Sequence, residues 1–600
     1  MVAGQQWVGL FPKLPNSSVL TYIGSTNNTS EISIKIPGFF LNETLVTGKS
    51  YQYPEIPDGH PILAKGSPDL QSMNFKLQLP ANRDMEASVV STEYKDYPAF
   101  EILPSIGNSV RGSMLIICPT EFMAAIAPLV KWRNQTGTYT TVIDANQFKD
   151  SSEIYNAVKT RYLADSTFAY LLLVGDSKQV PTNMLTIATE KKTTISASDN
   201  YYTYLSGNRS SNTIHNPDIM IGRFSAETVK DVEVQVRRTM EYEINPNADA
   251  NWLNTATGIA SIHEVGGNYK TDCGEIRKLI DTLKSNAYTN SNEFYDGSQG
   301  KGDANGNPSA SDIVAKINQG TGVVFYAGHG SPNGWLTGLV TKSVLESLNN
   351  SGKYPIIWSA SCDNGDFVDN LCFAESWLRA CDNKGKPLGA VATLMASSSQ
   401  SSGPAITAMH KIANILSYPQ KGVSTMGAIT LSGLISMNAT PGALSGTTTD
   451  SWILFGDPAL NVRTTKPKKL VVSHKGTITL GYDSYSITCN AADGFACISK
   501  DGNILGTASL AEGKATIKLT KPAAGDSLTL TITSFNYLPF ISEIKISKKP
   551  GIIEGLSPLN HSELQPISKT FSWKNGEGEN PIYYLFSLGT DNPPTNIINS

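Results

Sequence analysis

The chain has 600 residues, a length that predicts about four domains. Apolar residues make up 40% and charged residues 17% of the chain, a balance that excludes a disordered or fibrous protein. The formal net charge of −4, with no block of like charges, disfavours a nucleic-acid partner held by a basic patch.

Two further features exclude classes of protein. No run approaches about 18 uninterrupted apolar residues, so we expect no membrane span. The first residues lack a charged region followed by an apolar one, so we expect any export signal to be missing from this chain. The cysteines are residues 118, 273, 362, 372, 381, 489 and 497. They are too few and too scattered for a disulfide framework, and their odd number leaves at least one thiol unpaired. No C-x-x-C pair occurs among them, so structural zinc is not expected.

The N-terminal part, residues 1–107, is predicted to be an all-β domain. Runs such as 32–36 and 75–79 alternate apolar and polar residues, and Pro, Gly and Asn turns separate them. No long stretch with helical periodicity interrupts them. We therefore expect this segment to have its own small core.

Residues 108–464 are predicted to form an α/β domain. Continuous apolar runs of the kind found in buried strands occur at 113–118, 170–174, 322–327 and 355–360. Amphipathic stretches lie between them, at 121–132, 152–162, 226–242 and 275–283. Buried strands that alternate with such helices indicate a largely parallel sheet covered on both faces.

The C-terminal part returns to short alternating strands. They occur at 469–473, 486–489, 514–519 and 527–532, which predicts an immunoglobulin-like sandwich over 465–549. Residues 550–600 look like the opening strands of a further β-module of fibronectin III or adhesin type, and we expect the chain to be cut inside it.

Two strand ends of the α/β part carry reactive side chains. One predicted strand ends in Gly328, His329 and Gly330, and another leads into Ser361 and Cys362. Ligands of open α/β sheets bind beyond the carboxyl ends of the strands, so a cysteine and a histidine there suit a nucleophile and its base. Taken singly, such a cysteine is more often a small core residue and such a histidine a loop residue.

The same residues resemble a known family. The run 326–331, followed by Cys362, 364–367 and 372–375, resembles the catalytic signature of the gingipains, cysteine endopeptidases of peptidase family C25 with a caspase-like α/β fold. Further blocks match in the same order at 171–176, 221–225, 259–261 and 455–460. The likeness covers about 440 residues and continues into the immunoglobulin-like segment.

The resemblance implies roles for several residues. Cys362 is expected to be the nucleophile and His329 the general base and acid, with the backbone N–H groups of Gly330 and Cys362 as oxyanion donors. The family also has an acid that orients the histidine. That position falls within 261–265, where this chain has extra residues, and Glu264 is the expected acid.

The resemblance also implies a specificity. The arginine-specific branch has an aspartate at the bottom of the S1 pocket, which falls on Asp272 here, and a buried carboxylate would pair with an arginine side chain. Asp272 also precedes a helix and is a favoured residue for its N-cap. The aromatic residue that lines the pocket in that branch is replaced by Ser402 or a neighbour within 397–402. The acid that the lysine-specific branch uses near this point is absent, so arginine is the expected P1 residue.

Further expectations follow from the resemblance. The N-terminal β segment matches the place of the family's inhibitory propeptide, and cleavage after Arg111 would release it. The family binds structural Ca²⁺, and Asp303, Asn305 and Asn307 place oxygen side chains at alternate positions of one loop. Cys489 and Cys497 are candidates for a disulfide bond in an oxidising compartment.

The sequence thus predicts a secreted cysteine endopeptidase made as a zymogen, with protein or peptide substrates and no catalytic cofactor. Two rivals stay open. One is a non-catalytic surface adhesin on the same scaffold, which would not need both His329 and Cys362. The other is a peptide ligase or processing acyl-transferase, because an amine instead of water can capture the thioester.

Overall fold

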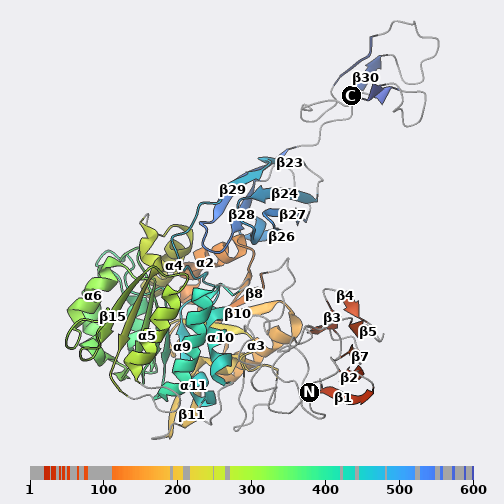
Figure 1. Cartoon of the computed structure of the whole chain (residues 1–600). Coiled ribbons are helices and arrows are strands. Elements are labelled where there is room, and N and C mark those ends of the chain that lie inside the picture. The colour runs from red at the N-terminus through yellow and green to blue at the C-terminus, as the bar shows by residue number, and fades with distance from the viewer. Residues whose placement is uncertain are drawn as a thin grey trace. The chain divides into compact units, whose positions relative to one another are not determined.

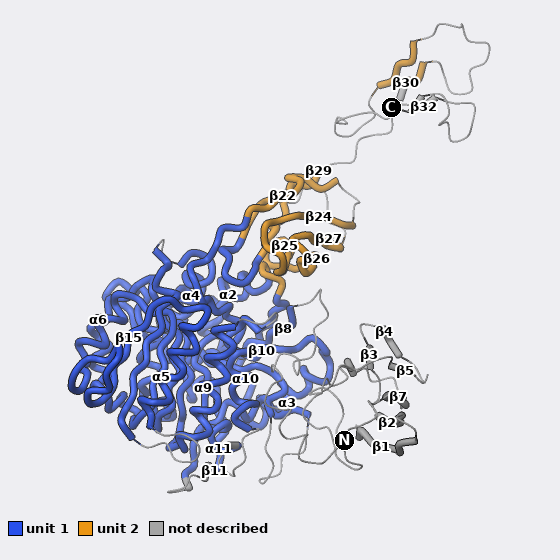
Figure 2. The backbone as a smooth tube through the Cα atoms, in the orientation of Figure 1, with its two compact units in different colours: residues 1–134, 138–470, 533–539 blue, residues 135–137, 471–532, 540–600 orange. Residues whose placement is uncertain are grey.

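The computed structural model describes most of the α/β part of the chain and the β unit that follows it (Figure 1). The described residues are 111–188, 193–206, 216–246, 249–263, 271–418, 423–438, 445–479, 483–520, 527–547, 554–557 and 570–574, and only the backbone of short strands within 19–78 and at 587–588 and 598–599. The chain divides into two compact units (Figure 2). Unit 1 holds residues 1–134, 138–470 and 533–539, and unit 2 holds residues 135–137, 471–532 and 540–600.

A ten-stranded sheet forms the centre of unit 1, in the order β15-β14-β16-β19-β20-β21-β13-β10-β8-β9. The strands are β8 (Ser113–Cys118), β9 (Tyr139–Asp144), β10 (Phe168–Val174), β13 (Met220–Phe224), β14 (Thr255–Ala260), β15 (Asn290–Tyr295), β16 (Val323–Ala327), β19 (Ile356–Ala360), β20 (Ala392–Ala396) and β21 (Trp452–Phe455). The four runs predicted as buried strands are therefore confirmed.

The sheet consists of two parallel halves that run in opposite directions. Neighbouring strands from β15 to β20 are parallel, and so are those from β21 to β9. Strands β20 and β21 meet antiparallel, with Ala396 opposite Trp452. Each half therefore has its own carboxyl edge, and the two edges lie at opposite ends of the sheet.

Helices cover both faces of the sheet, as the alternation of strands and amphipathic stretches predicts (Figure 1). The long helices are α2 (Met123–Gln135), α3 (Ser151–Ala164), α4 (Val229–Ile244), α5 (Asp272–Lys284), α6 (Ala310–Gln319), α9 (Ser402–Ser417) and α10 (Met426–Asn438); the shorter ones include α7 (Lys342–Leu345), α8 (Phe373–Arg379) and α11 (Ser445–Ser451). Capping boxes start α4 at Thr228 and α6 at Ser309, where each side chain accepts a backbone N–H of the first turn.

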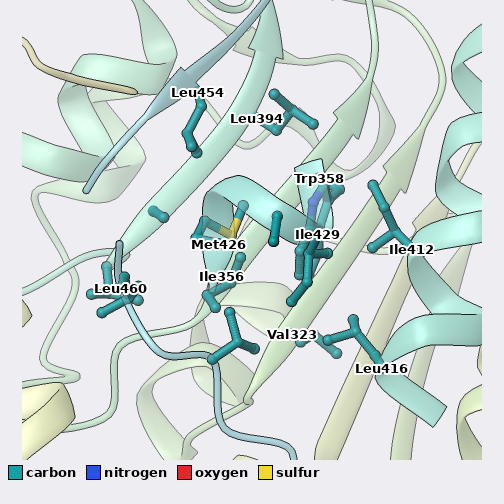
Figure 3. Close-up of a cluster of buried hydrophobic side chains, with 14 of the residues drawn as sticks. Val323, Ile356, Trp358, Leu394, Ile412, Leu416, Met426, Ile429, Leu454 and Leu460 are labelled. Carbon is teal, nitrogen blue, oxygen red and sulfur yellow. The ribbon is translucent and has the colours of Figure 1, made fainter. Parts of the chain in front are cut away.

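The strands bury alternate residues on opposite faces, which gives the unit separate cores. Val323 and Phe325 of β16 lie in the first core with α5, α9 and α10, whereas Val324 and Tyr326 lie in the second core with α6 and α8. Figure 3 shows part of the first core, where Ile356 and Trp358 of β19 pack near Ile412 of α9 and Ile429 of α10.

Unit 2 contains an eight-stranded sheet in the order β22-β24-β27-β26-β25-β28-β29-β23. Its strands are β22 (Val472–His474), β23 (Thr477–Thr479), β24 (Ser484–Cys489), β25 (Asp493–Lys500), β26 (Asn503–Ala511), β27 (Lys514–Lys518), β28 (Ser527–Thr533) and β29 (Phe540–Ser547). Cys489 and Cys497, the two candidates for a disulfide bond, are both free thiols in this structure. They lie on β24 and β25, which β27 and β26 separate in the sheet.

Short strands lie in the two terminal parts of the chain. The N-terminal ones are β1 (Val19–Thr26), β2 (Thr29–Lys35), β3 (Phe39–Leu41), β4 (Thr44–Val46), β5 (Tyr51–Tyr53), β6 (Ala64–Gly66) and β7 (Met73–Gln78), and the C-terminal ones are β30 (Glu554–Ser557), β31 (Ser572–Lys574), β32 (Ser587–Leu588) and β33 (Ile598–Asn599). Among the residues that the structure describes, no helix has the length and apolar character needed to cross a membrane.

Candidate active site

The register of β16 and β19 brings His329 and Cys362 to one place. Ala327, at the end of β16, pairs with Ala360, at the end of β19, in a parallel ladder. His329 and Cys362 each follow two residues later, and neighbouring strands lie about 4.8 Å apart. The two predicted catalytic residues therefore leave the same edge of the sheet side by side.

The backbone of His329 is fixed from two sides while its side chain is exposed. The hydroxyl of Tyr326 donates a hydrogen bond to the His329 carbonyl at 2.6 Å, and the N–H of Leu336 donates to the same oxygen at 3.1 Å. Tyr326 is buried, and burial raises its pKa well above the usual value for tyrosine, so the hydroxyl stays a donor. The imidazole is thus presented to solvent on a rigid loop.

Cys362 lies on a sharply turned, half-buried loop. The next residue, Asp363, has a φ of 59°, in the left-handed region that non-glycine residues seldom adopt. The Cys362 thiol has one weak contact, 3.9 Å from the carbonyl oxygen of Gln400. A cysteine so lightly held differs from the small core residue that the alternative interpretation expects.

Asn364 joins the cysteine loop to the histidine loop. Its amide nitrogen donates to the carbonyls of Ser331 at 2.8 Å and Gly334 at 3.2 Å, and its amide oxygen accepts from Ser359 at 2.9 Å. The Ser359 hydroxyl in turn accepts from the Trp335 indole at 3.0 Å. Because these groups are buried and mutually satisfied, they hold the two reactive loops at a fixed spacing.

Gly330 packs directly against the cysteine loop. A Cβ atom at position 330 would lie 2.1 Å from Oγ of Ser361 and 3.1 Å from the carbonyl oxygen of Cys362, so no side chain fits there. This close approach explains the glycine after His329. The role of the Gly330 and Cys362 N–H groups as oxyanion donors stays a prediction.

A second imidazole and a buried carboxylate accompany His329. The ring of His263, three residues after the end of β14, contacts the His329 ring edge to face, with 4.3 Å between centroids. The carboxylate of Asp272 accepts a hydrogen bond from the hydroxyl of Ser261. The N–H of Asp272 donates to the carbonyl of His263 at 2.9 Å, which holds the start of α5 against this loop.

Asp272 is the buried acid of the site, with 4% of its surface exposed. Burial raises the pKa of its carboxyl, while the Ser261 hydroxyl and the nearby imidazoles of His263 and His329 act in the opposite direction. The prediction that Asp272 is the N-cap of its helix is wrong. Thr271 is the N-cap and accepts the N–H of Gly274 at 3.2 Å, so Asp272 is the first residue of α5 and its carboxylate bonds Ser261 instead of capping the helix.

The segment 397–402 lies on the other side of Cys362. It follows β20, the strand next to β19, and ends at the start of α9. The amide nitrogen of Gln400 donates to the carbonyl of Ser361 at 3.2 Å, and Ser402 is exposed. Helices α5 and α9 pack together in the first core, so the predicted pocket residues Asp272 and Ser402 begin two neighbouring helices.

In the loop that is predicted to bind calcium, side-chain oxygens accept hydrogen bonds from backbone N–H groups. The two carboxylate oxygens of Asp303 accept the N–H groups of Tyr295 and Gln299, both at 3.0 Å, and the side-chain oxygen of Asn307 accepts the N–H of Gly297 at 2.7 Å. The Ca²⁺ site expected at Asp303, Asn305 and Asn307 stays a prediction. No group of three His, Cys, Asp or Glu side chains suited to a metal occurs among the described residues.

Two further predicted residues are Glu264 and Arg111. Glu264, the expected orienting acid, lies outside the described residues. Arg111, the expected processing site, is half-buried and precedes β8 by two residues.

The sequence did not single out Ser261, His263, Ser361 or Gln400. His263 stood one residue before the predicted acid, but only the tertiary contact places its ring against His329. The Ser361 hydroxyl and the side-chain oxygen of Gln400 are buried without a hydrogen-bond partner among the described residues. Unsatisfied polar atoms beside a nucleophile are a functional signal that no sequence pattern carries.

Comparison with known proteins identifies the family to which the chain belongs. The profile of "Peptidase family C25" matches residues 108–463, and that of the family's C-terminal Ig-like domain matches residues 473–547. Gingipain R2 of Porphyromonas gingivalis is 30% identical over 505 residues, which cover 82% of this chain and 64% of that protein. Lys-gingipain HG66 of the same organism is 24% identical over 511 residues, covering 78% of this chain and 28% of that protein.

Solved structures agree with the profiles. The Arg specific cysteine proteinase gingipain R superposes with a TM-score of 0.67 at 30% identity, covering 73% of this chain and 98% of that one. A complex of pro- and mature domains from Porphyromonas gingivalis has the same TM-score and identity and is covered fully. The family profile matches more than half of the chain and agrees with the caspase-like α/β fold. The chain belongs to peptidase family C25, a family of cysteine endopeptidases.

Proposed function

We propose that this chain is a secreted cysteine endopeptidase that cleaves peptide bonds after arginine and is made as a zymogen. The pairing of Ala327 with Ala360, which sets His329 beside Cys362, is the observation that carries the proposal. The chain spans 64% of the length of gingipain R2, so its activity, substrates and partners are proposals that rest on the site.

The chemistry follows from the pair. The Cys362 thiol gives its proton to His329, and the sulfur attacks the peptide carbonyl to form a tetrahedral intermediate. The C–N bond then breaks as His329 returns the proton to the leaving amine. Water, deprotonated by His329, hydrolyses the remaining thioester and regenerates the thiol. Oxyanion donors typically contribute about 3–4 kcal/mol to such a reaction, and Gly330 and Cys362 N–H are the proposed donors.

Arginine at P1 is proposed from Asp272. Its carboxylate is buried at the start of α5, a helix that packs beside α9 in the first core. A guanidinium would pair with this carboxylate through two hydrogen bonds and relieve the cost of burying it. The arginine specificity of the related gingipain R agrees with this choice.

The test is hydrolysis of matched fluorogenic peptides with Arg, Lys or a neutral residue at P1, under reducing conditions, by wild type and Cys362→Ala. Arg-selective turnover that Cys362→Ala abolishes is the expected result. Turnover with neutral P1 residues would support the peptidase activity but refute the proposal that Asp272 binds a P1 arginine. An ester substrate incubated with an added amine would reveal a ligase, since the acyl group would then appear on the amine.

The zymogen is tested in the same preparation. The pro- and mature-domain complex of the related enzyme motivates residues 1–107 as an inhibitory propeptide. We expect N-terminal sequencing to find a new terminus after Arg111 as activity appears, and Arg111→Ala to delay both. Activity of the uncleaved chain equal to that of the cleaved one would remove this part of the proposal. A requirement for Ca²⁺ is checked by adding a chelator to the mature enzyme.

A further inference from the structure

The loop after His329 exposes two leucines beside the reactive edge. Leu336 is 56% exposed and Leu339 is 65% exposed, although both are large apolar side chains. The N–H of Leu336 donates to the His329 carbonyl at 3.1 Å, and the N–H of Leu339 donates to the Leu336 carbonyl at 3.1 Å. The leucine pair is therefore tied by hydrogen bonds to the catalytic histidine itself.

The loop that carries the leucine pair is held in a conformation that leaves both side chains exposed. Leu339 has a φ of 50°, a left-handed conformation that is unfavourable for leucine, and Gly338 before it has a φ of 69°. A Cβ at Gly338 would lie 2.4 Å from Ile313 of α6, so the loop is pressed against the second core. Thr337 is fixed by its hydroxyl, which donates to Asp296 at 2.8 Å. Backbone strain kept in place by such contacts is a feature of functional sites.

The leucine pair and the P1 pocket lie on opposite faces of the sheet. Helices α5 and α9, which begin at Asp272 and Ser402, pack in the first core. Trp335 and Val340, which flank the leucine loop, pack in the second core on the other face. His329 and Cys362 leave the edge between these two faces.

An extended substrate points successive side chains to opposite sides. A P1 side chain that enters the pocket between α5 and α9 therefore directs the P1′ side chain toward the face with the leucine pair. His329 must also lie near the leaving amine to protonate it, and that amine belongs to the P1′ residue. We infer that Leu336 and Leu339 form an S1′ subsite that selects substrates with an apolar residue after the cleaved bond.

This inference rests on the proposed peptidase function, and the experiment separates the two. Internally quenched peptides carry the preferred P1 residue and Leu, Phe, Gly or Asp at P1′, with all other positions held constant. We expect kcat/KM to be at least tenfold higher with Leu than with Asp, the range that apolar pocket contacts give. Cleavage without any preference at P1′ would overturn the subsite and leave the peptidase intact, whereas no cleavage of any peptide would remove the peptidase.

Variants link the preference to the two side chains. The double variant Leu336→Ser/Leu339→Ser is expected to bring the Leu-to-Asp ratio toward one; the ratio does not depend on how much of the sample is folded. Leu339→Lys is expected to raise kcat/KM for Asp at P1′ above the wild-type value. The control is Leu163→Ser, because Leu163 is also largely exposed, at 73%. It lies on α3, which connects β9 and β10 in the half of the sheet that does not contain β16 and β19. An unchanged ratio in the double variant would overturn the inference.

A second readout uses the acyl-enzyme. An amine that captures the thioester must occupy the leaving-group side, so leucinamide is expected to compete with water better than glycinamide in the wild type. This advantage is expected to disappear in the double variant. Equal capture of the two amines by the wild type would contradict an apolar S1′ subsite.

Discussion

The two carboxyl edges of the sheet in unit 1 differ in how their polar groups are used. At the edge of β16 and β19, His329 is exposed and the Cys362 thiol has one weak contact. At the opposite edge, β10, β13 and β21 lead into Asp176, Ser225 and Asp457, and these groups are buried in hydrogen bonds and ion pairs. Both edges satisfy the rule for ligand sites of open sheets, but the first leaves a histidine and a thiol available for chemistry, whereas these three groups of the second are already bonded.

The second edge is filled by arginines. Arg223, with no exposed surface, pairs with Asp199 at 2.7 Å and donates to the carbonyls of Gly175 and Val180. Arg133 joins Asp457 to Glu243 at 2.6 and 2.8 Å. At the second edge these arginines pair with buried carboxylates, and this difference separates a reactive site from a structural one.

The largest effect is expected from His329→Ala. Removal of the general acid and base should lower kcat/KM by about 10⁴-fold or more, as loss of such a residue does in other peptidases. The thermal midpoint should stay within about 1 °C, because the side chain is exposed. His474→Ala in unit 2 is the control for the loss of a histidine, and equal losses in both variants would refute the role of His329.

At the second edge the effect should appear in stability. Arg223→Met leaves the buried carboxylate of Asp199 uncompensated, and we expect about 3–5 kcal/mol less free energy of unfolding in urea for unit 1. The control is Arg237→Met, because Arg237 forms an exposed pair with Glu241 that contributes less than about 1 kcal/mol. A small effect of Arg223→Met would mean that the second edge is not structural.

The pocket carboxylate gives the next effect. Asp272→Asn should reduce kcat/KM for P1 arginine by about 10²-fold relative to a neutral P1 residue, because the guanidinium loses its charged partner. Asp281→Asn, on the exposed side of the same helix, is the control. Equal losses for arginine and neutral substrates would mean that Asp272 does not bind the P1 side chain. Its role would then be to interact with the nearby imidazoles of His263 and His329.

The second edge also predicts a dependence of stability on pH. Burial, together with Asp176, raises the pKa of Glu375 to about 7 against the pull of Arg379. The unfolded chain ionises Glu375 near its usual pKa, so this residue stabilises the fold below about pH 4.5 and the stabilisation is lost as the pH rises toward 7. Glu375→Gln should flatten thermal midpoints across that window.

The matched control for this window is Glu227→Gln. Glu227 contacts the same arginine, Arg379, at 3.2 Å but is more than half exposed. Its variant should keep the wild-type pH profile. If both variants gave the same profile, the buried environment of Glu375 would not be the cause.

The smallest effect concerns His263. His263→Ala removes the ring that packs on His329 and should lower kcat by about 2- to 10-fold with little change in KM, the range for an aromatic contact. His263→Phe keeps a ring and should restore most of kcat. Alkylation of Cys362 by iodoacetamide should follow the same order of variants, and an unchanged rate in His263→Ala would argue against positioning.

The sequence predicted well what depends on local pattern. Apolar runs placed β8, β10, β16 and β19 to within two residues, because buried parallel strands must be apolar throughout. The residues after two of those strands then predicted the reactive pair. The resemblance to the C25 family added the roles, and the family comparison confirmed the membership.

What the sequence missed depends on contacts between distant segments. The reversal between β20 and β21 is set by how two remote strands pair, so a largely parallel sheet was expected without its two opposed halves. The N-cap of α5 shifted by one residue to Thr271, because the Asp272 carboxylate bonds Ser261 instead of its own helix. Strand order likewise separates Cys489 from Cys497, and no spacing in the sequence reveals it.

The antiparallel contact of β20 with β21 has a consequence for how such a protein changes over time. The loops that we propose to select substrates leave one end of the sheet, and the buried ion pairs of Arg223 and Arg133 lie at the other end. Substitutions that retune specificity, such as those at Ser402 or Leu339, therefore need not disturb Arg223 or Arg133. The loops proposed to set specificity and the ion pairs that stabilise the fold are thus separated in space, so new specificities can arise without a matching loss of stability.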